Sequence, residues 1–461
     1  MSRISLLSCI VLSLTFGCAA DIRGDGDGGT TGPDGSIVGN DAGAPDSRLP
    51  FASVTGTIWA PGNAPGMVPP GEEIPVFNAL VQVRTSQPDG IPNMVHCERC
   101  VEAFGFTGTS AHDGSFSVTG ITPGSYWLVI QKGQFRLEQQ INLGPGETLS
   151  LDTATTTLPS LHSPELGQWV PRIAVGTGSY DELQDVLGKM GIGAVDADGS
   201  YMTDGAGSNR IDFYYNGGEH YTPESGTLAD LVADYGRLQQ YHIVFIPCSG
   251  SLHTAALQQP GVLQNLRQYV SDGGKLYVTD WSGEWHDNVF PAHIELEAGH
   301  DTPAAAYDRA SNSWNTSQFG DADGSSYNSE HAEAVDDDLR LWLDGQMGPL
   351  ALGGNGVFNA SDMVVEGSWN TIMNTNRVEI GVDDEGLAVL DDPRVYVIGD
   401  QDGALPKRPL TVTYEPVGCG RVLYSTYHTT ETAHQGLAPQ ERILLYLIME
   451  IGVCKEGPIL I

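Results

Sequence analysis

The chain contains few basic residues. Of its 461 residues, 22 are Lys or Arg and 58 are Asp or Glu, which gives a formal net charge of −36. Nucleic acids and polyphosphates are bound through clusters of Lys and Arg, so this balance excludes them as partners. It suits a protein that works outside the cytoplasm.

Long apolar runs are also missing. The run at residues 4–16 follows the cation Arg3 and is too short to span a bilayer, and no other segment could span one. A short apolar run behind one basic residue is typical of a signal peptide. The sequence therefore predicts export, with residues 1–17 removed.

The end of this run resembles a bacterial lipobox. Gly17 precedes Cys18, which would become the acylated N-terminus, although Leu14 stands one place further out than is usual. Ala19, and not an aspartate, follows this cysteine, so the resemblance implies a lipoprotein of the outer membrane. The lipid would anchor the protein, which makes the membrane its partner. The alternative is an ordinary secretory signal cleaved near Ala19 or Ala20, which would leave a secreted or periplasmic protein.

Large apolar side chains are scarce after the cysteine. Residues 18–50 are mostly Gly, Asp, Thr, Ser and Pro. Such a segment cannot bury enough surface to offset the entropy of ordering. It predicts a disordered acidic tether that holds a folded body away from the membrane.

Cysteine is rare, and seven are present. Once Cys9 is cleaved off and Cys18 acylated, five remain, and pairing is expected in an oxidising compartment. Cys97 and Cys100 have the spacing of a redox motif or half a zinc site, but no second pair follows, so a local disulfide is predicted. We also expect Cys419, just before the last predicted strand, to pair with Cys454, just after the last predicted helix. Cys248 is then left without a partner.

Residues 51–160 predict a small β-sandwich. Short alternating strands recur about every ten residues, with turn residues between them. The stretches at 54–58, 78–83, 113–120 and 123–130 resemble the carboxypeptidase regulatory-like domain, a transthyretin-like sandwich of the carbohydrate-binding-like superfamily. The resemblance implies a structural or adhesive role and does not by itself imply sugar binding.

Residues 169–461 alternate between buried-strand and helical patterns. This predicts a flavodoxin-like, three-layer α/β domain with a parallel sheet. An insertion at about 287–374 interrupts the pattern, with a helix expected at 334–343 and loops elsewhere. Four stretches resemble the class I glutamine amidotransferase-like superfamily, closest to its trehalose-utilisation branch: 173–191, 242–248, 266–279 and 420–428.

The resemblance implies a catalytic cysteine paired with a histidine and a carboxylate. Cys248, His428 and Glu431 look like that triad, but the family's nucleophile follows the next strand, where Trp281 stands. The family's acid also lies two residues after the histidine, and here it lies three after. We therefore expect no glutamine hydrolysis, and the alternative is an amidase or hydrolase acting through Cys248 or Asp280 with His428.

Polar and aromatic residues gather where the predicted strands end. Two indoles beside carboxylates and imidazoles suit sugar stacking or a weak metal site. Two Asp-rich turns, at 196–200 and 321–325, lack the glycine and glutamate positions of an EF-hand loop. We predict no metal and no cofactor, and a cell-surface protein with a binding or structural role and carbohydrate as a candidate ligand. The candidate binding residues at this rim are Ser249, His253, Trp281, Glu284, Trp285 and His286.

Overall fold

A computed structural model describes most of the chain beyond residue 48. The described residues are 49–97, 105–202, 210–250, 254–297, 306–308, 313–315, 326–350, 354–357, 359–383, 385–430 and 432–451. The chain divides between Arg48 and Leu49. The predicted signal peptide, Cys18 and nearly all of the predicted tether lie outside the described residues. The described part is mostly β-sheet, with several sheets and few helices.

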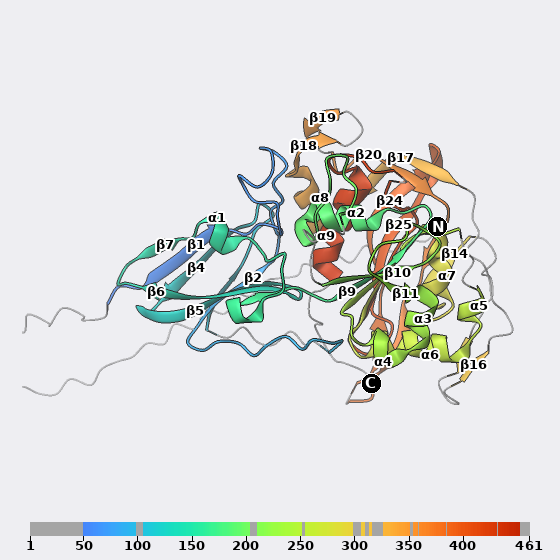
Figure 1. Ribbon diagram of the computed structural model, residues 1–461, viewed down its shortest axis with the longest axis horizontal. Coiled ribbons are helices and arrows are strands. Elements are labelled where there is room, and N and C mark those ends of the chain that lie inside the picture. Colours follow the sequence, from blue (N-terminus) through green and yellow to red (C-terminus); the bar gives the residue numbers. More distant parts are fainter. Residues whose placement is uncertain are drawn as a thin grey trace, which may run out of the picture. The chain divides into compact units, whose positions relative to one another are not determined.

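The first strands form two sheets around a common core (Figure 1). Alternate residues of each strand point inward, as Phe116 and Val118 do in β4 (Ser115–Ile121). The three-stranded sheet has the order β4, β1 (Ala52–Thr57), β7 (Thr148–Ser150). The five-stranded sheet has the order β3 (Phe106–Thr109), β2 (Leu80–Arg84), β5 (Gly124–Lys132), β6 (Phe135–Leu143), β8 (Gln168–Trp169), and two short helices, α1 (Thr153–Thr156) and η1 (Pro164–Leu166), follow β7.

A ten-stranded sheet forms the centre of the remaining chain. Six neighbouring strands are parallel, and the rest continue the sheet in antiparallel pairs. The parallel strands, in sheet order, are β11 (Glu224–Thr227), β10 (Ile211–Tyr215), β9 (Ile173–Thr177), β12 (Ile243–Ile246), β13 (Lys275–Thr279) and β26 (Arg421–Ser425). The antiparallel extension is β25 (Ala404–Tyr414), β24 (Arg394–Gln401), β17 (Tyr327–Ala334) and β20 (Met363–Ser368).

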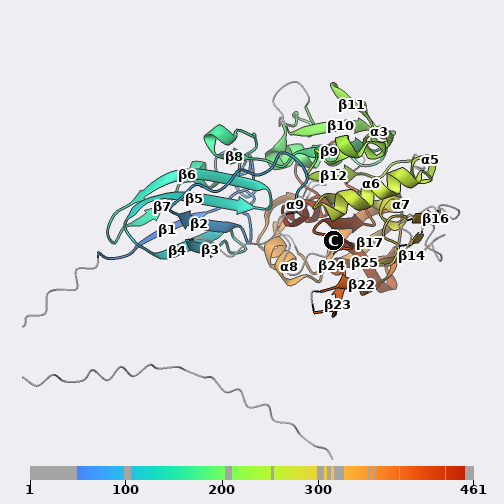
Figure 2. The same ribbon diagram turned by 90° about the horizontal axis from the view of Figure 1, so that it is seen from below.

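Helices cover both faces of the parallel strands (Figures 1 and 2). Ile243 and Phe245 of β12 pack in one core with α2 (Leu183–Leu187), η2 (Gly188–Ile192) and α9 (Pro439–Ile451). Val244 and Ile246 pack in another, with α3 (Leu228–Ala233) and α6 (Pro260–Ser271). Because successive side chains of a strand point to opposite faces, a fully apolar strand needs cover on both. Within the described residues, no helix is long and apolar enough to cross a bilayer.

The helical pattern at residues 228–240 is divided between two helices, α3 and α4 (Tyr235–Leu238), because the Asp234 side chain caps the second one at the Arg237 N–H. The expected helix in the insertion is α8 (Asp337–Asp344), but loops were expected where strands form. The strands that form in this insertion are β17 and β20, and also β14 (Ile294–Leu296), β15 (Ala306–Asp308), β16 (Ser313–Asn315), β18 (Met347–Leu350), β19 (Gly354–Val357) and β21 (Ile372–Thr375). The remaining elements are α5 (Thr254–Leu257), η3 (Asp280–Gly283), α7 (Glu284–Asp287), β22 (Val378–Val382) and β23 (Ala388–Asp391).

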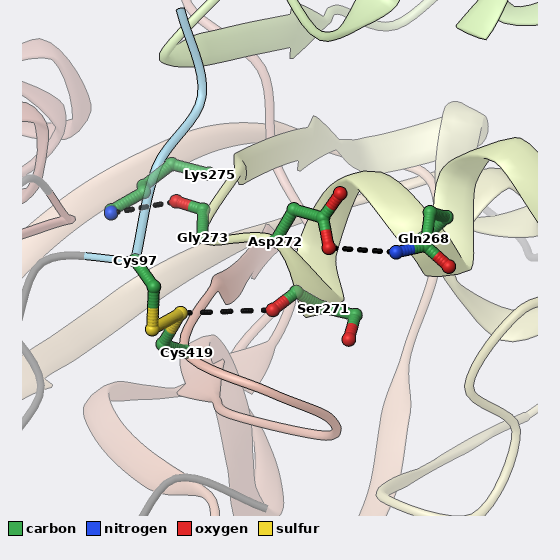
Figure 3. The surroundings of a disulfide bond; sticks show 7 residues. All are labelled: Cys97, Gln268, Ser271, Asp272, Gly273, Lys275 and Cys419. Carbon is green, nitrogen blue, oxygen red and sulfur yellow. Dashed lines mark hydrogen bonds between the residues drawn. A yellow bond between two sulfur atoms is a disulfide. The ribbon is translucent and has the colours of Figure 1, made fainter. Parts of the chain in front are cut away.

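The disulfide prediction was wrong. Cys97 pairs with Cys419, 322 residues away, and neither pairs locally; Cys100 and Cys454 lie outside the described residues. The bond lies beside the turn between α6 and β13, at Ser271 and Gly273 (Figure 3). Gly273 has φ +106, and a Cβ there would stand 2.1 Å from the His96 carbonyl oxygen, so the turn can lie this close only as glycine.

Backbone contacts along the segment before Cys97 explain the long-range pairing. The Val95 N–H donates to the Gln239 carbonyl at 2.8 Å, and His242 Nε2 donates to the Pro92 carbonyl at 2.9 Å. His242 Nδ1 accepts from the Arg172 N–H, and burial lowers the pKa of His242 to about 3, so the ring stays neutral. The segment is thus fixed against the α4–β12 connection, which places Cys97 near the turn before β26.

We expect non-reducing peptide mapping to recover Cys97 linked to Cys419. Replacing both with serine should lower the free energy of unfolding by about 2–5 kcal/mol, because the bond closes a long loop in the unfolded chain. Urea denaturation measures this, with Ser271→Ala as a control beside the bond. A peptide linking Cys97 to Cys100, or Cys419 to Cys454, would contradict the pairing.

Candidate functional site

The turn after β13 carries a strained residue. Asp280 follows the last strand residue and has φ 47, a left-handed conformation that costs a residue with a side chain roughly 1–3 kcal/mol. The Tyr424 hydroxyl donates to its carbonyl at 2.9 Å, and the Trp369 N–H donates to its Oδ1 at 2.6 Å. A strained strand-to-helix turn is the position that carries a nucleophile in many α/β hydrolases. Trp281, which was expected at the nucleophile position, directly follows this strained residue.

Asp280 forms a buried cluster with His428 and Cys248. Oδ2 of Asp280 lies 2.7 Å from Nδ1 of His428, and the Cys248 thiol donates a hydrogen bond to the same carboxylate. The three residues come from the ends of the adjacent strands β13, β26 and β12. Their exposed fractions are 0%, 4% and 1%, so the cluster is sealed from solvent.

Burial sets the protonation of this cluster. It raises the pKa of Asp280 to about 6, against the opposing effect of the His428 hydrogen bond. Burial, and then the charge of Asp280, raise the pKa of Cys248 well above its usual range. A thiol held in its protonated form is a poor nucleophile. Burial at this position therefore favours the protonated form of Cys248.

Four of the expected rim residues are buried, and three of these lie in one short helix. Glu284, Trp285 and His286 belong to α7 and are buried, and Trp285 is part of the core under α6. The hydroxyl of Tyr414 and Nδ1 of His286 lie 3.0 Å apart. The short helix turns inward because its indole gains more by burial than by exposure, so Trp285 offers no sugar platform.

The other candidate residues differ in where they lie. Ser249 is buried and donates to the Asn216 carbonyl at 2.5 Å. His253 and Glu431 lie outside the described residues. Trp281 is half-buried and is the expected rim aromatic that stays near the surface.

Two further aromatic residues flank Trp281. Its ring stacks on Trp369, with centroids 5.9 Å apart and planes at 12°, and Tyr180 lies 6.4 Å away on a tilt. Trp369 and Tyr180 are 38% and 41% exposed. Of these three residues, here called the aromatic patch, only Trp281 was predicted from the sequence. The signal that pointed to Trp369 was the recurrence of Ser-Trp-Asn-Thr at residues 313–316 and 368–371.

An acidic cavity of about 400 Å³ opens at the carboxyl ends of β9 and β10. Its walls combine carboxylates with phenols, and they come from the start of α2, the loop after β10 and the residues around 200 and 433. The acids at the start of α2 were not among the site residues expected from the sequence. The lining residues are Glu182, Asp185, Ser200, Tyr201, Glu219, His220, Tyr221, Thr222 and Ala433.

Two of the cavity carboxylates, those of Glu182 and Asp185, are hard to ionise. Burial, followed by the charges of Asp185 and Asp181, raises the pKa of Glu182 to about 7. Burial also raises the pKa of Asp185 to about 6, although its Oδ1 accepts from the Tyr201 N–H at 2.8 Å. A ligand that donates hydrogen bonds or carries positive charge would relieve this cost.

Asp181 joins the acidic cavity to the buried cluster. Its Oδ2 accepts from the Thr279 hydroxyl at 2.6 Å, and its Oδ1 accepts from the Thr429 N–H at 3.1 Å. Thr279 and Thr429 directly adjoin Asp280 and His428. The buried carboxylate therefore fixes the start of α2 against both halves of the cluster.

The Asp-rich turn at 196–200 satisfies its own backbone. The Asp196 Oδ1 accepts from the N–H groups of Asp198 and Ser200 at 2.9 and 3.0 Å. This is an Asx-type turn, in which the aspartate bonds its own loop. The second copy, at 321–325, lies outside the described residues.

Comparisons with known proteins identify no family for this chain. No family model matches the chain. No curated protein matches it. Among solved structures, it is similar to a ThuA-like protein of Parabacteroides merdae at 12% identity, over 62% of this chain and 91% of the other, with a TM-score of 0.30. That score is too low for the likeness to support any argument about this chain.

We expect the Glu182→Gln variant to gain stability over the unchanged protein as pH rises from about 4.5 to about 7. The folded state raises the pKa of Glu182, so it binds more protons than the unfolded state in this window and its stability falls as pH rises. Glutamine cannot ionise and escapes that loss. Urea denaturation across the window measures the difference, with the exposed Glu165→Gln as control. Parallel stability curves for Glu182→Gln and the unchanged protein would contradict the raised pKa.

Proposed function

We propose that this chain is an exported cell-surface binding protein whose ligand, a carbohydrate of the cell envelope, occupies the acidic cavity. The observation that carries the proposal is the contrast between two neighbouring groups of polar residues. The acidic cavity has about 400 Å³ of space and partly exposed carboxylates. The cluster of Cys248, Asp280 and His428 is sealed, so it offers no room for a substrate. An open polar site beside a closed one favours binding over catalysis.

The order of the parallel strands supports this location. Numbered along the chain, the six parallel strands stand in the order 3-2-1-4-5-6, which is a doubly wound order. Without the short edge strand β11, the other five have the order 2-1-3-4-5, as in flavodoxin-like sheets. In such sheets ligands bind outside the carboxyl ends of the strands, where the strand order reverses. The reversal falls between β9 and β12, and the loops after β9 and β10 line the acidic cavity. We therefore propose a flavodoxin-like, trehalose-utilisation-like α/β domain for residues 169–461.

The lining chemistry supports a sugar as ligand. Carboxylates accept the hydrogen bonds of sugar hydroxyls, and those to a charged acceptor contribute about 1.5–3 kcal/mol each. The Gln184 side chain donates to the Tyr221 hydroxyl at 2.8 Å, and that hydroxyl donates to Glu219 Oε2 at 3.4 Å, so these groups are already oriented. Tyr180, which directly precedes Asp181, and Trp369 each flank Trp281 with an exposed ring, and these rings would extend the surface for a longer glycan.

The proposed cellular location depends on the N-terminal residues. A signal peptide, acylation of Cys18 and an acidic tether would hold the folded part at the outer membrane, with a regulatory-like β-sandwich at residues 51–160 as a structural or adhesive module. Replacing Cys18 with alanine should abolish labelling by a clickable fatty acid and release the chain from membranes. Labelling that survives the change would contradict the lipid anchor.

A second candidate function is hydrolysis through Asp280 and His428. It is favoured by the left-handed backbone of Asp280 at the strand end and by the 2.7 Å contact between its Oδ2 and His428 Nδ1. Access to Asp280 would require Trp369 to move, since its backbone N–H covers Oδ1. Cleavage of a bound glycan that is lost in Asp280→Asn would favour this candidate.

We expect the full chain to bind at least one glycan from a panel of cell-envelope oligosaccharides. Glu219→Gln should weaken that binding about tenfold or more, because it loses a charged acceptor at the cavity wall. Surface plasmon resonance on immobilised glycans measures the change, and Glu165→Gln, which alters an exposed glutamate elsewhere, should bind like the unchanged chain. Equal losses in both variants, or no glycan bound by the unchanged chain, would contradict the proposal.

A further inference from the structure

The buried cluster brings three metal-ligating atom types together. The Cys248 thiol, the Asp280 carboxylate and the His428 imidazole each offer one atom, and these atoms lie within 4.8 Å of one another. The parallel register explains the convergence, because Ile246 of β12 stands opposite Val278 of β13, two residues before Cys248 and Asp280. The sheet therefore sets the positions of Cys248 and Asp280.

The carboxylate of Asp280 is buried beside an imidazole. In the part of the chain that the structure describes, its ion pair is with His428, which compensates the negative charge only while the imidazole is protonated. A buried carboxylate beside a neutral partner is costly. A divalent ion bound to the thiolate of Cys248 and the carboxylate of Asp280 would leave the three groups electrically neutral, with His428 as an uncharged ligand.

The surroundings orient the ligands as a metal site requires. The Trp369 N–H holds Oδ1 of Asp280, which leaves Oδ2 facing His428 Nδ1. A Cβ on Gly367 would stand 2.7 Å from His428 Nε2, so the backbone packs against the far edge of the ring and Nδ1 faces the cluster. Groups that orient ligands in this way are typical of metal centres in proteins.

We propose that Cys248, Asp280 and His428 hold one Zn²⁺ or a similar divalent transition-metal ion. Sulfur, imidazole nitrogen and carboxylate oxygen are the ligands of zinc sites, whereas a thiol disfavours Mg²⁺ and Ca²⁺. Tetrahedral zinc separates its nitrogen and oxygen ligands by about 3.3 Å. The ion would replace the 2.7 Å contact between Oδ2 and Nδ1 with a slightly wider one. The acidic cavity does not take part in this site, so the inference stands apart from the proposed function.

Cobalt substitution tests the site directly. The full chain, without a histidine tag, is stripped of metal, refolded with one equivalent of Co²⁺ and scanned for absorption. We expect a sulfur-to-cobalt charge-transfer band in the near ultraviolet and intense visible bands of tetrahedral cobalt, both saturating at one ion per chain and displaced by Zn²⁺. No charge-transfer band in the unchanged protein would overturn the proposal without any variant having to fold.

Variants assign the ligands. Cys248→Ser should lose the charge-transfer band, and Cys248→Ser and His428→Asn should each weaken Zn²⁺ binding by about 100-fold or more, beyond the usual effect of a neighbouring residue. Circular dichroism checks that each variant is folded. Glu165→Gln serves as the matched control, and Glu182→Gln tests the rival location in the acidic cavity. A band that survives Cys248→Ser, or Zn²⁺ binding that falls with Glu182→Gln alone, would overturn the assignment.

Discussion

The carboxylate and backbone of Asp280 tie together the whole carboxyl edge of the parallel sheet. Oδ1 accepts from the Trp369 N–H, Oδ2 contacts His428, and the backbone carbonyl accepts from the Tyr424 hydroxyl. These bonds come from the segment after β20 and from β26 and the residues that follow it. They hold a left-handed aspartate whose backbone would otherwise relax, so strain at one residue is balanced by contacts from two distant parts of the chain. The turn that an enzyme would expose is here closed by its neighbours.

This closure determines where a ligand can go. With Trp369 lying over Asp280, the accessible polar space moves to the loops after β9 and β10, where the acidic cavity lies. Asp181 couples the two regions, since it bonds Thr279 and Thr429 on one side and precedes Glu182 on the other. A sealed cluster close to an open cavity agrees with the proposed binding role. The cluster fixes the strand ends, and under that proposal the cavity would supply the ligand contacts.

Much of the secondary structure could be predicted, because apolar periodicity is local. The strands at β9, β12 and β13 and the helix α9 follow directly from their runs of buried residues. The disulfide could not be predicted, because proximity in the sequence favoured Cys100 as the partner of Cys97 and only the tertiary path of the segment before Cys97 brings Cys419 near. Trp285 was placed at the rim for the same reason: sequence shows that α7 follows a strand end, but not that its indole turns inward. The acids of the cavity were missed because Glu182 and Asp185 have the spacing of ordinary helix-surface residues.

The accessibility of Cys248 tests the central claim, a sealed cluster at the strand ends, most directly. Iodoacetamide labelling of the native full chain near neutral pH, followed by peptide mass spectrometry, reports this one thiol separately from the other cysteines. We predict that Cys248 stays unmodified in the native protein and reacts only after denaturation, because it is buried and its pKa is raised. Rapid native modification of Cys248 would contradict the account and restore an open, reactive site at Asp280 and His428.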